Sequence, residues 1–156
     1  MAGSARYVAQ LSERERSSIA LNINLDSVAG GTRLAALTSG FAALEPFLLS
    51  VADANGHNLR CVRPLMTNSD HANFALAGIP AFRVVAGYDD PAALVRLVLT
   101  TADTRDKVSR AELAAAAQLA ACLTAAACQV DRLTVRNWRN RGDGLPTTDF
   151  RRTSAS

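Results

Sequence analysis

Apolar and polar positions recur along the chain with two periods, which predict short strands separated by helices. Residues 19–25 alternate apolar and amide side chains and stop at Asp26, the pattern of a strand with one face on a core. Residues 41–54 carry apolar side chains at helical spacing and end at Asn55-Gly56, a typical helix stop. Further strands are predicted at 33–37, 59–64 and 81–86, and further helices at 4–11, 69–77, 90–99 and 110–128. Strands that alternate with helices in this way predict an α/β layer fold.

The composition is that of a folded domain whose core is built from small side chains. The chain has 156 residues, enough for one compact domain. Hydrophobic residues make up 49% and aromatic residues 5%, and alanine is abundant, so we expect close packing of aliphatic side chains. The sequence has no apolar run of about 18 residues, as a membrane span requires, and its first residues lack the apolar region of a signal peptide. We therefore expect a cytoplasmic protein without a membrane partner.

The net charge of +3 is concentrated at the end of the chain. From residue 129 onward, six arginines stand against three aspartates, so this segment carries the whole excess. A nucleic-acid binder usually has a basic face on its folded body as well. We therefore expect a folded domain over residues 1–128, a basic and flexible tail over residues 129–156, and no nucleic-acid partner. The cysteines Cys61, Cys122 and Cys128 lack metal-ligand spacing and are expected to be free thiols.

Three fragments contain residues that are suited to chemistry. Asn22-Ile23-Asn24-Leu25-Asp26 ends a strand on a carboxylate, and such positions line ligand crevices in open α/β sheets. Ser69-Asp70-His71 opens a helix with an acid and an imidazole side by side, and Asp103 lies in the turn of residues 100–104. The residues alone favour structural roles: a turn cap for Asp26, a helix-dipole acid for Asp70 and a core position for His71.

In this order the fragments resemble the C-terminal half of zinc-dependent aminopeptidases with a co-catalytic metal pair, metallopeptidase family twenty-eight. Bacterial leucyl aminopeptidases belong to that family, and glutaminyl cyclases are relatives. The resemblance runs from about residue 3 to about residue 128. It implies an α/β fold, a partial three-layer mixed β-sheet flanked by helices, and a parent chemistry that uses zinc to release N-terminal residues from peptide substrates. It further implies that Asp26 is a metal ligand and that Asp70, His71 and Asp103 orient the site around the metal.

The sequence departs from the family pattern at several positions. Leu99 stands where the family has a histidine ligand before its Thr-x-x-Asp-Thr turn, and a leucine side chain cannot bind zinc. The family's His-x-Asp and Glu-Glu motifs lie upstream of a Gly-Ser-x-x-Tyr-Val helix, and this sequence begins at Met1, next to that helix. A catalytic zinc needs three protein ligands. We therefore expect no catalytic residue, weak zinc binding and a truncated polypeptide that is inactive alone.

The alternative from another class is a non-catalytic binding module that keeps the fold and contacts an acidic partner through its basic tail. In both cases a truncated sheet would expose an edge strand, which readily pairs with other chains. We therefore expect a protein partner, or a second copy of this chain, to cover that edge.

Overall fold

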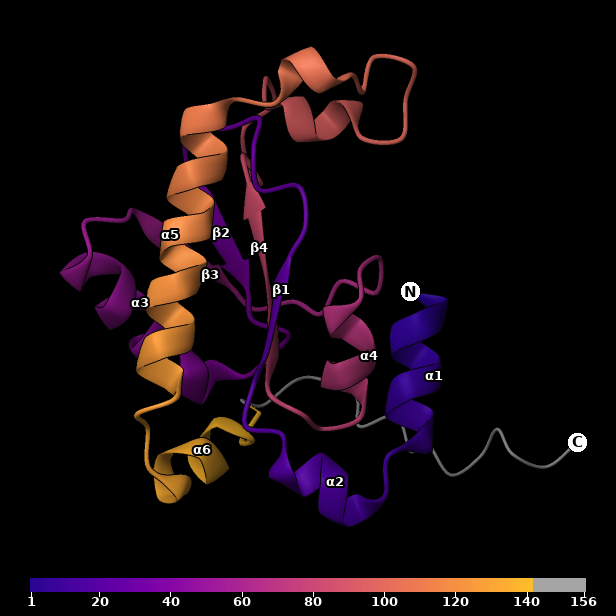
Figure 1. Cartoon of the computed structure of the whole chain (residues 1–156), viewed down its shortest axis with the longest axis vertical. Coiled ribbons are helices and arrows are strands. Elements are labelled where there is room, and N and C mark those ends of the chain that lie inside the picture. The colour runs from indigo at the N-terminus through magenta and orange to yellow at the C-terminus, as the bar shows by residue number, and fades with distance from the viewer. Residues whose placement is uncertain (142–156) are drawn as a thin grey trace, which may run out of the picture.

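The computed structural model describes residues 1–141, in which four strands and six α-helices follow one another in nearly the predicted order (Figure 1). The strands are β1 (Asn22–Leu25), β2 (Leu34–Leu37), β3 (Leu59–Val62) and β4 (Ala81–Ala86). The helices are α1 (Ala2–Gln10), α2 (Glu13–Ser18), α3 (Glu45–Ala54), α4 (His71–Leu76), α5 (Arg110–Ala127) and α6 (Arg132–Trp138). Short 3-10 helices lie at Ala42–Leu44, Leu94–Leu97 and Arg105–Lys107. The prediction of a helix over residues 90–99 is therefore wrong except for one 3-10 turn.

The four strands form one mixed sheet in the order β1-β4-β2-β3. β1 runs parallel to β4 and β2 parallel to β3, while β2 and β4 are antiparallel. All six residues of β4 are buried, because this strand has a neighbour on each side and packed elements on both faces. The mixed sheet flanked by helices confirms the predicted α/β class. β1 and β3 are the edges of the sheet within residues 1–141.

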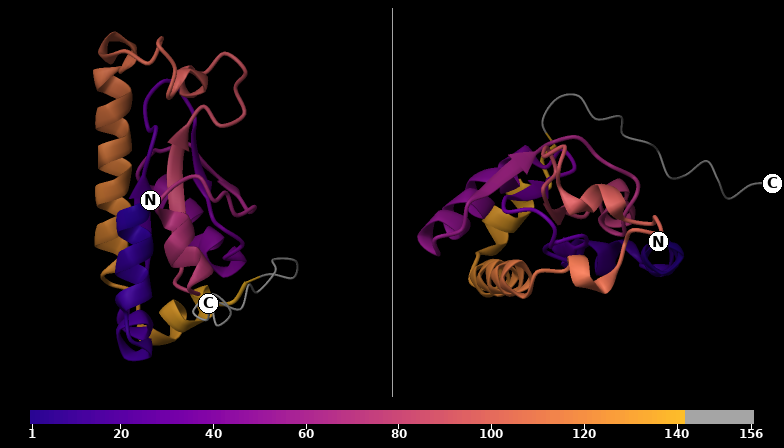
Figure 2. Two further views of the ribbon diagram at one scale, coloured as in Figure 1. Left: turned by 90° about the vertical axis from the view of Figure 1, so that its right-hand side faces the viewer. Right: turned by 90° about the horizontal axis from the view of Figure 1, so that it is seen from above.

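The main core lies between the sheet and α5. Figure 1 shows α5 in front of the sheet, α4 beside β1 and α1 on the far side of α4, and the side view in Figure 2 shows α5 as a separate layer. Phe82 and Val84 of β4 share one buried cluster with Leu119 and Leu123 of α5. Truncating a buried leucine of this kind to alanine typically costs about 2–5 kcal/mol. This cluster therefore holds α5 on the sheet.

The start of α5 is tied to the loop that follows β1. Ser109 caps the helix by accepting a hydrogen bond from the Glu112 N–H at 3.3 Å. The Glu112 carboxylate accepts a hydrogen bond from the Gly30 N–H at 2.7 Å. Gly30 has φ +97°, and a side chain there would meet the Cβ of Leu94 at 2.7 Å. Ser109 thus caps α5, while the Glu112 carboxylate holds the loop after β1 in place.

The segment after α5 folds onto the body as far as residue 141. α6 begins at its Asp131 cap, and Trp138 at its end is 1% exposed within the main core cluster. The Trp138 ring packs 4.8 Å from the ring of Phe47 in α3. The predicted flexible tail therefore does not begin at residue 129, because α6 has an apolar side to bury. Residues 142–156 of that prediction lie outside the described range. No helix within residues 1–141 is long and apolar enough to cross a membrane.

Candidate functional site

Asp26 stands directly after the carboxyl end of β1, where the sequence predicted a site acid. Its N–H donates to the Val84 carbonyl at 3.3 Å, so its backbone still belongs to the sheet. The next residue, Ser27, has φ +60°, a left-handed conformation that costs free energy for a residue with a side chain. The Ser27 carbonyl accepts a hydrogen bond from the Ala86 N–H at 2.9 Å, which holds that turn in place. The direction of the Asp26 carboxylate is therefore set by the sheet.

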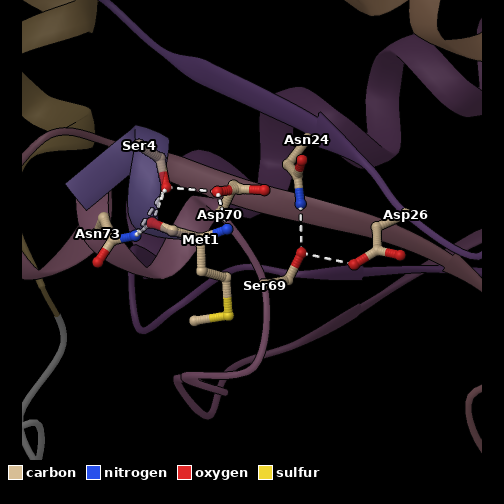
Figure 3. Close-up of polar contacts among 7 residues, drawn as sticks. All are labelled: Met1, Ser4, Asn24, Asp26, Ser69, Asp70 and Asn73. Atoms are coloured by element: carbon tan, nitrogen blue, oxygen red, sulfur yellow. Dashed lines mark hydrogen bonds and ion pairs between the residues drawn. The ribbon is translucent and has the colours of Figure 1, made fainter. Parts of the chain in front are cut away.

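Ser69 connects Asp26 to the segment before α4. Its hydroxyl donates to Asp26 Oδ2 at 2.6 Å and accepts from Asn24 Nδ2 at 2.7 Å (Figure 3). The helix predicted over residues 69–77 begins later, as α4 at His71, and the Ser69 side chain does not cap it. A hydrogen bond to a charged carboxylate is stronger than one to a helix amide. The hydroxyl therefore turns to β1, and Ser69 joins the site, although in this fragment the sequence pointed only to Asp70 and His71 as site residues.

Arg83 supplies a positive charge beside Asp26. It lies in β4 opposite Asn24 of β1, so its side chain leaves the sheet on the same face as that asparagine. The Arg83 side chain is 9% exposed, with Nε 3.5 Å from Asp26 Oδ2 and 3.4 Å from the Asp26 carbonyl oxygen. Its Nη1 also donates to Asn68 Oδ1 at 3.3 Å. A guanidinium this deeply buried requires an anionic partner, and Asp26 provides it.

His71 lies in the interior next to this ion pair. It is 0% exposed, and neither ring nitrogen has a hydrogen-bond partner among the described residues. The pKa of His71 is lowered to about 4, mainly by burial and secondly by the charge of Arg83, while Asp26 and Asp70 oppose the shift. The imidazole is therefore neutral near pH 7, and it is packed as a core side chain.

Asp70 faces away from Asp26. Its carboxylate accepts a hydrogen bond from the Ser4 hydroxyl of α1 and lies 3.2 Å from the Met1 amino group (Figure 3). The Ser4 hydrogen bond is the main reason that the pKa of Asp70 is lowered, followed by the bond from the Met1 amino group. Asn73 donates to the same Ser4 hydroxyl at 2.7 Å. Asp70 thus joins α1 to α4, while the preceding Ser69 faces β1.

Asp103 and Leu99 lie together in the loop that separates two 3-10 helices. Asp103 Oδ2 accepts a hydrogen bond from the Leu99 N–H at 3.2 Å, inside the loop and not within the group around Asp26. Leu99 has φ +66° and is 96% exposed. The structure therefore brings Asp26, Ser69, Arg83 and His71 together and leaves Asp103 with its own loop.

The donors around Asp26 do not fit a zinc ion. They are one carboxylate, the hydroxyl of Ser69, the amide of Asn24 and the guanidinium of Arg83. Zinc prefers thiolate, imidazole and carboxylate ligands, usually three or four together. In the part of the chain that the structure describes, no three His, Cys, Asp or Glu side chains gather closely enough to hold a metal ion. A fixed positive charge at the carboxylate also opposes a second cation there.

Comparisons with known proteins found one matching family model and several similar solved structures. The family model described as peptidase family M28 matches residues 1–124. The solved structure of BSAP, a zinc aminopeptidase from Bacillus subtilis, shares 26% identity and a TM-score of 0.65, covering 81% of this chain and 32% of that one. An aminopeptidase from Aneurinibacillus sp. strain AM-1 shares 25% identity and a TM-score of 0.68, covering 81% and 30%. The chain thus spans about a third of the length of these structures. No curated protein matches it.

Proposed function

The chain belongs to peptidase family M28, and on that premise we propose that Arg83 occupies the cation position at Asp26, so that this polypeptide does not release N-terminal residues from peptides by itself. The resemblance expected from the three sequence fragments is confirmed by the match over residues 1–124. Zinc aminopeptidase activity is the chemistry of the similar solved structures, and this chain spans about a third of their length. The observation that carries the proposal is the nearly buried guanidinium beside the carboxylate.

Electrostatics favour Arg83 over a metal ion at Asp26. An arginine side chain stays protonated at every pH at which proteins fold. Two like unit charges about 5 Å apart repel by about 3 kcal/mol in a medium of effective dielectric constant about 20, and a divalent ion doubles that repulsion. A zinc ion at Asp26 would therefore have to displace Arg83, which would leave its buried guanidinium without a carboxylate partner.

The polar contacts around Asp26 support a structural role for the carboxylate. Asn24, Ser69 and Arg83 bring β1, the segment before α4 and β4 to one carboxyl group. These contacts hold three segments of the fold together without a metal. They favour the alternative from the sequence, a non-catalytic module that keeps the family's fold, as the form in which this polypeptide acts alone.

Zinc titration of matched variants tests the proposal. We expect wild-type protein to bind zinc weakly in calorimetry, and Arg83→Met, which keeps the aliphatic packing, to bind it about tenfold more tightly, a gain of about 1.4 kcal/mol. Arg83→Lys keeps the charge and is the control that should stay weak. Adding Asp26→Asn to Arg83→Met should remove the gain, because the carboxylate is then lost.

A peptidase assay on the same proteins completes the test. With zinc present, wild-type protein is expected to leave an aminoacyl p-nitroanilide unhydrolysed. Circular dichroism establishes that each variant is folded. Tight zinc binding by wild-type protein, together with hydrolysis that Asp26→Asn abolishes, would refute the proposal.

A further inference from the structure

A basic groove lies between α2 and α6, away from the residues around Asp26. It has a volume of about 740 Å³ and is lined by residues of α2, the end of α5 and α6. Figure 1 shows α2 and α6 at the lower end of the molecule. Four of its lining residues are arginines from two distant parts of the chain: Arg14, Arg132, Arg136 and Arg139. We call this surface the arginine groove.

The charge of the arginine groove is not neutralised within the described part of the chain. None of its four arginines forms an ion pair with a carboxylate of residues 1–141. Asp131 is the nearest acid in sequence on α6, but it caps the helix and accepts hydrogen bonds from Leu133 and Thr134. Arg132 and Arg136 are four residues apart and therefore project from the same face of α6. The groove presents several positive charges on one side.

Arg139 holds the groove in shape. Its guanidinium donates hydrogen bonds, at 2.8 to 3.2 Å, to the carbonyl oxygens of Arg16, Ser17, Ile19 and Gly78. These bonds join the end of α6 to the end of α2 and to the turn after α4. Burial lowers the pKa of Arg139, which has carbonyl partners in place of an anion. The walls are therefore fixed before any ligand arrives, which reduces the ordering cost of binding.

The lining between the arginines consists mainly of small and aliphatic side chains, with Ser17 and Ser18 of α2 as its uncharged polar residues. Val130 and Val135 line the groove together with alanines of α5 and of the segment before β1, and no aromatic residue of the described chain lines it. Single-stranded nucleic acids bind by stacking their bases on aromatic side chains, which this lining does not offer. Aliphatic side chains of a ligand can pack against the valines and alanines of the lining, and carboxylates of the ligand can pair with the arginines of the groove.

We propose that the arginine groove binds an acidic peptide segment of a partner protein in which carboxylates alternate with aliphatic side chains. The carboxylates pair with Arg14, Arg132 and Arg136, and the aliphatic side chains cover Val130 and Val135. This proposal is independent of the role of Asp26, because the groove shares no residue with that site.

Fluorescence anisotropy with a labelled Glu/Leu peptide tests the ligand class. The peptide has about twelve residues, which reach about 40 Å in extended form at about 3.3 Å per residue. We expect saturable binding that weakens with rising salt, because exposed ion pairs are screened. The same peptide with glutamine in place of glutamate should bind at least about tenfold more weakly, since it loses every charge pair. Binding of an oligothymidylate of equal charge is measured in the same way, to compare a nucleic acid with the peptide.

Charge-reversed variants test the location. Arg132→Glu combined with Arg136→Glu should weaken binding of the Glu/Leu peptide by about tenfold or more, because two attractions become repulsions. Arg6→Glu with Arg110→Glu changes the net charge equally at two exposed residues outside the groove and should keep at least half the affinity. Arg132→Gln with Arg136→Gln repeats the test should the reversed variant fail to fold. Equal losses in both pairs, equal binding of the glutamine peptide, or tighter binding of the oligothymidylate would overturn the proposal.

Discussion

Lowering the pH from 7 to 4.5 should destabilise this protein mainly through one buried histidine. His71 is fully buried without a hydrogen-bond partner among the described residues, and its pKa is lowered to about 4 from an ordinary value of 6.5. The unfolded chain therefore binds a proton as the pH falls below 6.5, while the native state stays unprotonated until about pH 4. Because the unfolded state binds more protons in that window, the free energy of unfolding falls as the pH falls.

The size of the effect follows from the two pKa values of His71. With pKa values of 6.5 unfolded and about 4 folded, proton linkage lowers the free energy of unfolding by about 2 kcal/mol between pH 7 and pH 4.5. Below pH 4 the native imidazole is protonated too, and the loss levels off at about 3 kcal/mol. The free energy of unfolding of a folded domain is usually about 5–15 kcal/mol, so such a loss is a large share of it.

Urea denaturation at the two pH values measures the effect directly. His71→Leu replaces the imidazole by an apolar side chain of similar size, so it should remove most of the pH dependence and leave stability at pH 7 nearly unchanged or slightly higher. His57→Leu is the matched control, because it removes the other histidine of the chain. An unchanged difference between the two pH values in His71→Leu would refute the assignment.

Three further predictions concern the fold. Trp138→Ala should lower the free energy of unfolding in urea by about 3–5 kcal/mol, because the ring is buried in the main core; a loss below about 1 kcal/mol would mean that α6 is not part of the cooperative unit. Ser69→Ala should cost about 1–2 kcal/mol in the same assay by breaking the link between Asn24 and Asp26, and a neutral outcome would contradict that link. Self-association through the edge strands β1 and β3 predicts a melting temperature that rises with protein concentration, which scanning calorimetry at several concentrations checks.

Elements with a strong local pattern were predicted from the sequence. The strand predicted over residues 81–86 has the same bounds as β4, because an apolar run follows Pro80 and ends before Gly87. The helix predicted from residue 110 begins there as α5, since Ser109 is a strong cap. The resemblance to the peptidase family was also confirmed, because the motif fragments are local in sequence.

The errors arose where distant packing decides the outcome. Residues 90–99 have a helix-start signal at Pro91 and many apolar side chains, but Leu94, Val98 and Leu99 find no core surface and stay exposed. Without burial of an apolar face, a short helix is unstable in water. Residues 132–138 were assigned to a tail because of their arginines, although the spacing of Val135 and Trp138 is that of an apolar helix side.

The partner of Asp26 was missed for the same reason. Arg83 lies 57 positions away, and the two residues meet because β1 pairs with β4 in parallel. A charged residue inside an otherwise apolar strand was the available signal, because such a residue needs an ionic partner when it is buried. Which acid serves as that partner depends on the strand order, and the sequence pattern does not specify that order.

The role of Arg83 at Asp26 is tested most directly by X-ray diffraction from crystals grown with zinc, with data collected at the zinc absorption edge. We predict that the Arg83 guanidinium stays beside the Asp26 carboxylate and that no anomalous peak lies within bonding distance of its oxygens, about 2.0–2.2 Å. A zinc peak bonded to Asp26, with Arg83 turned away, would contradict the account.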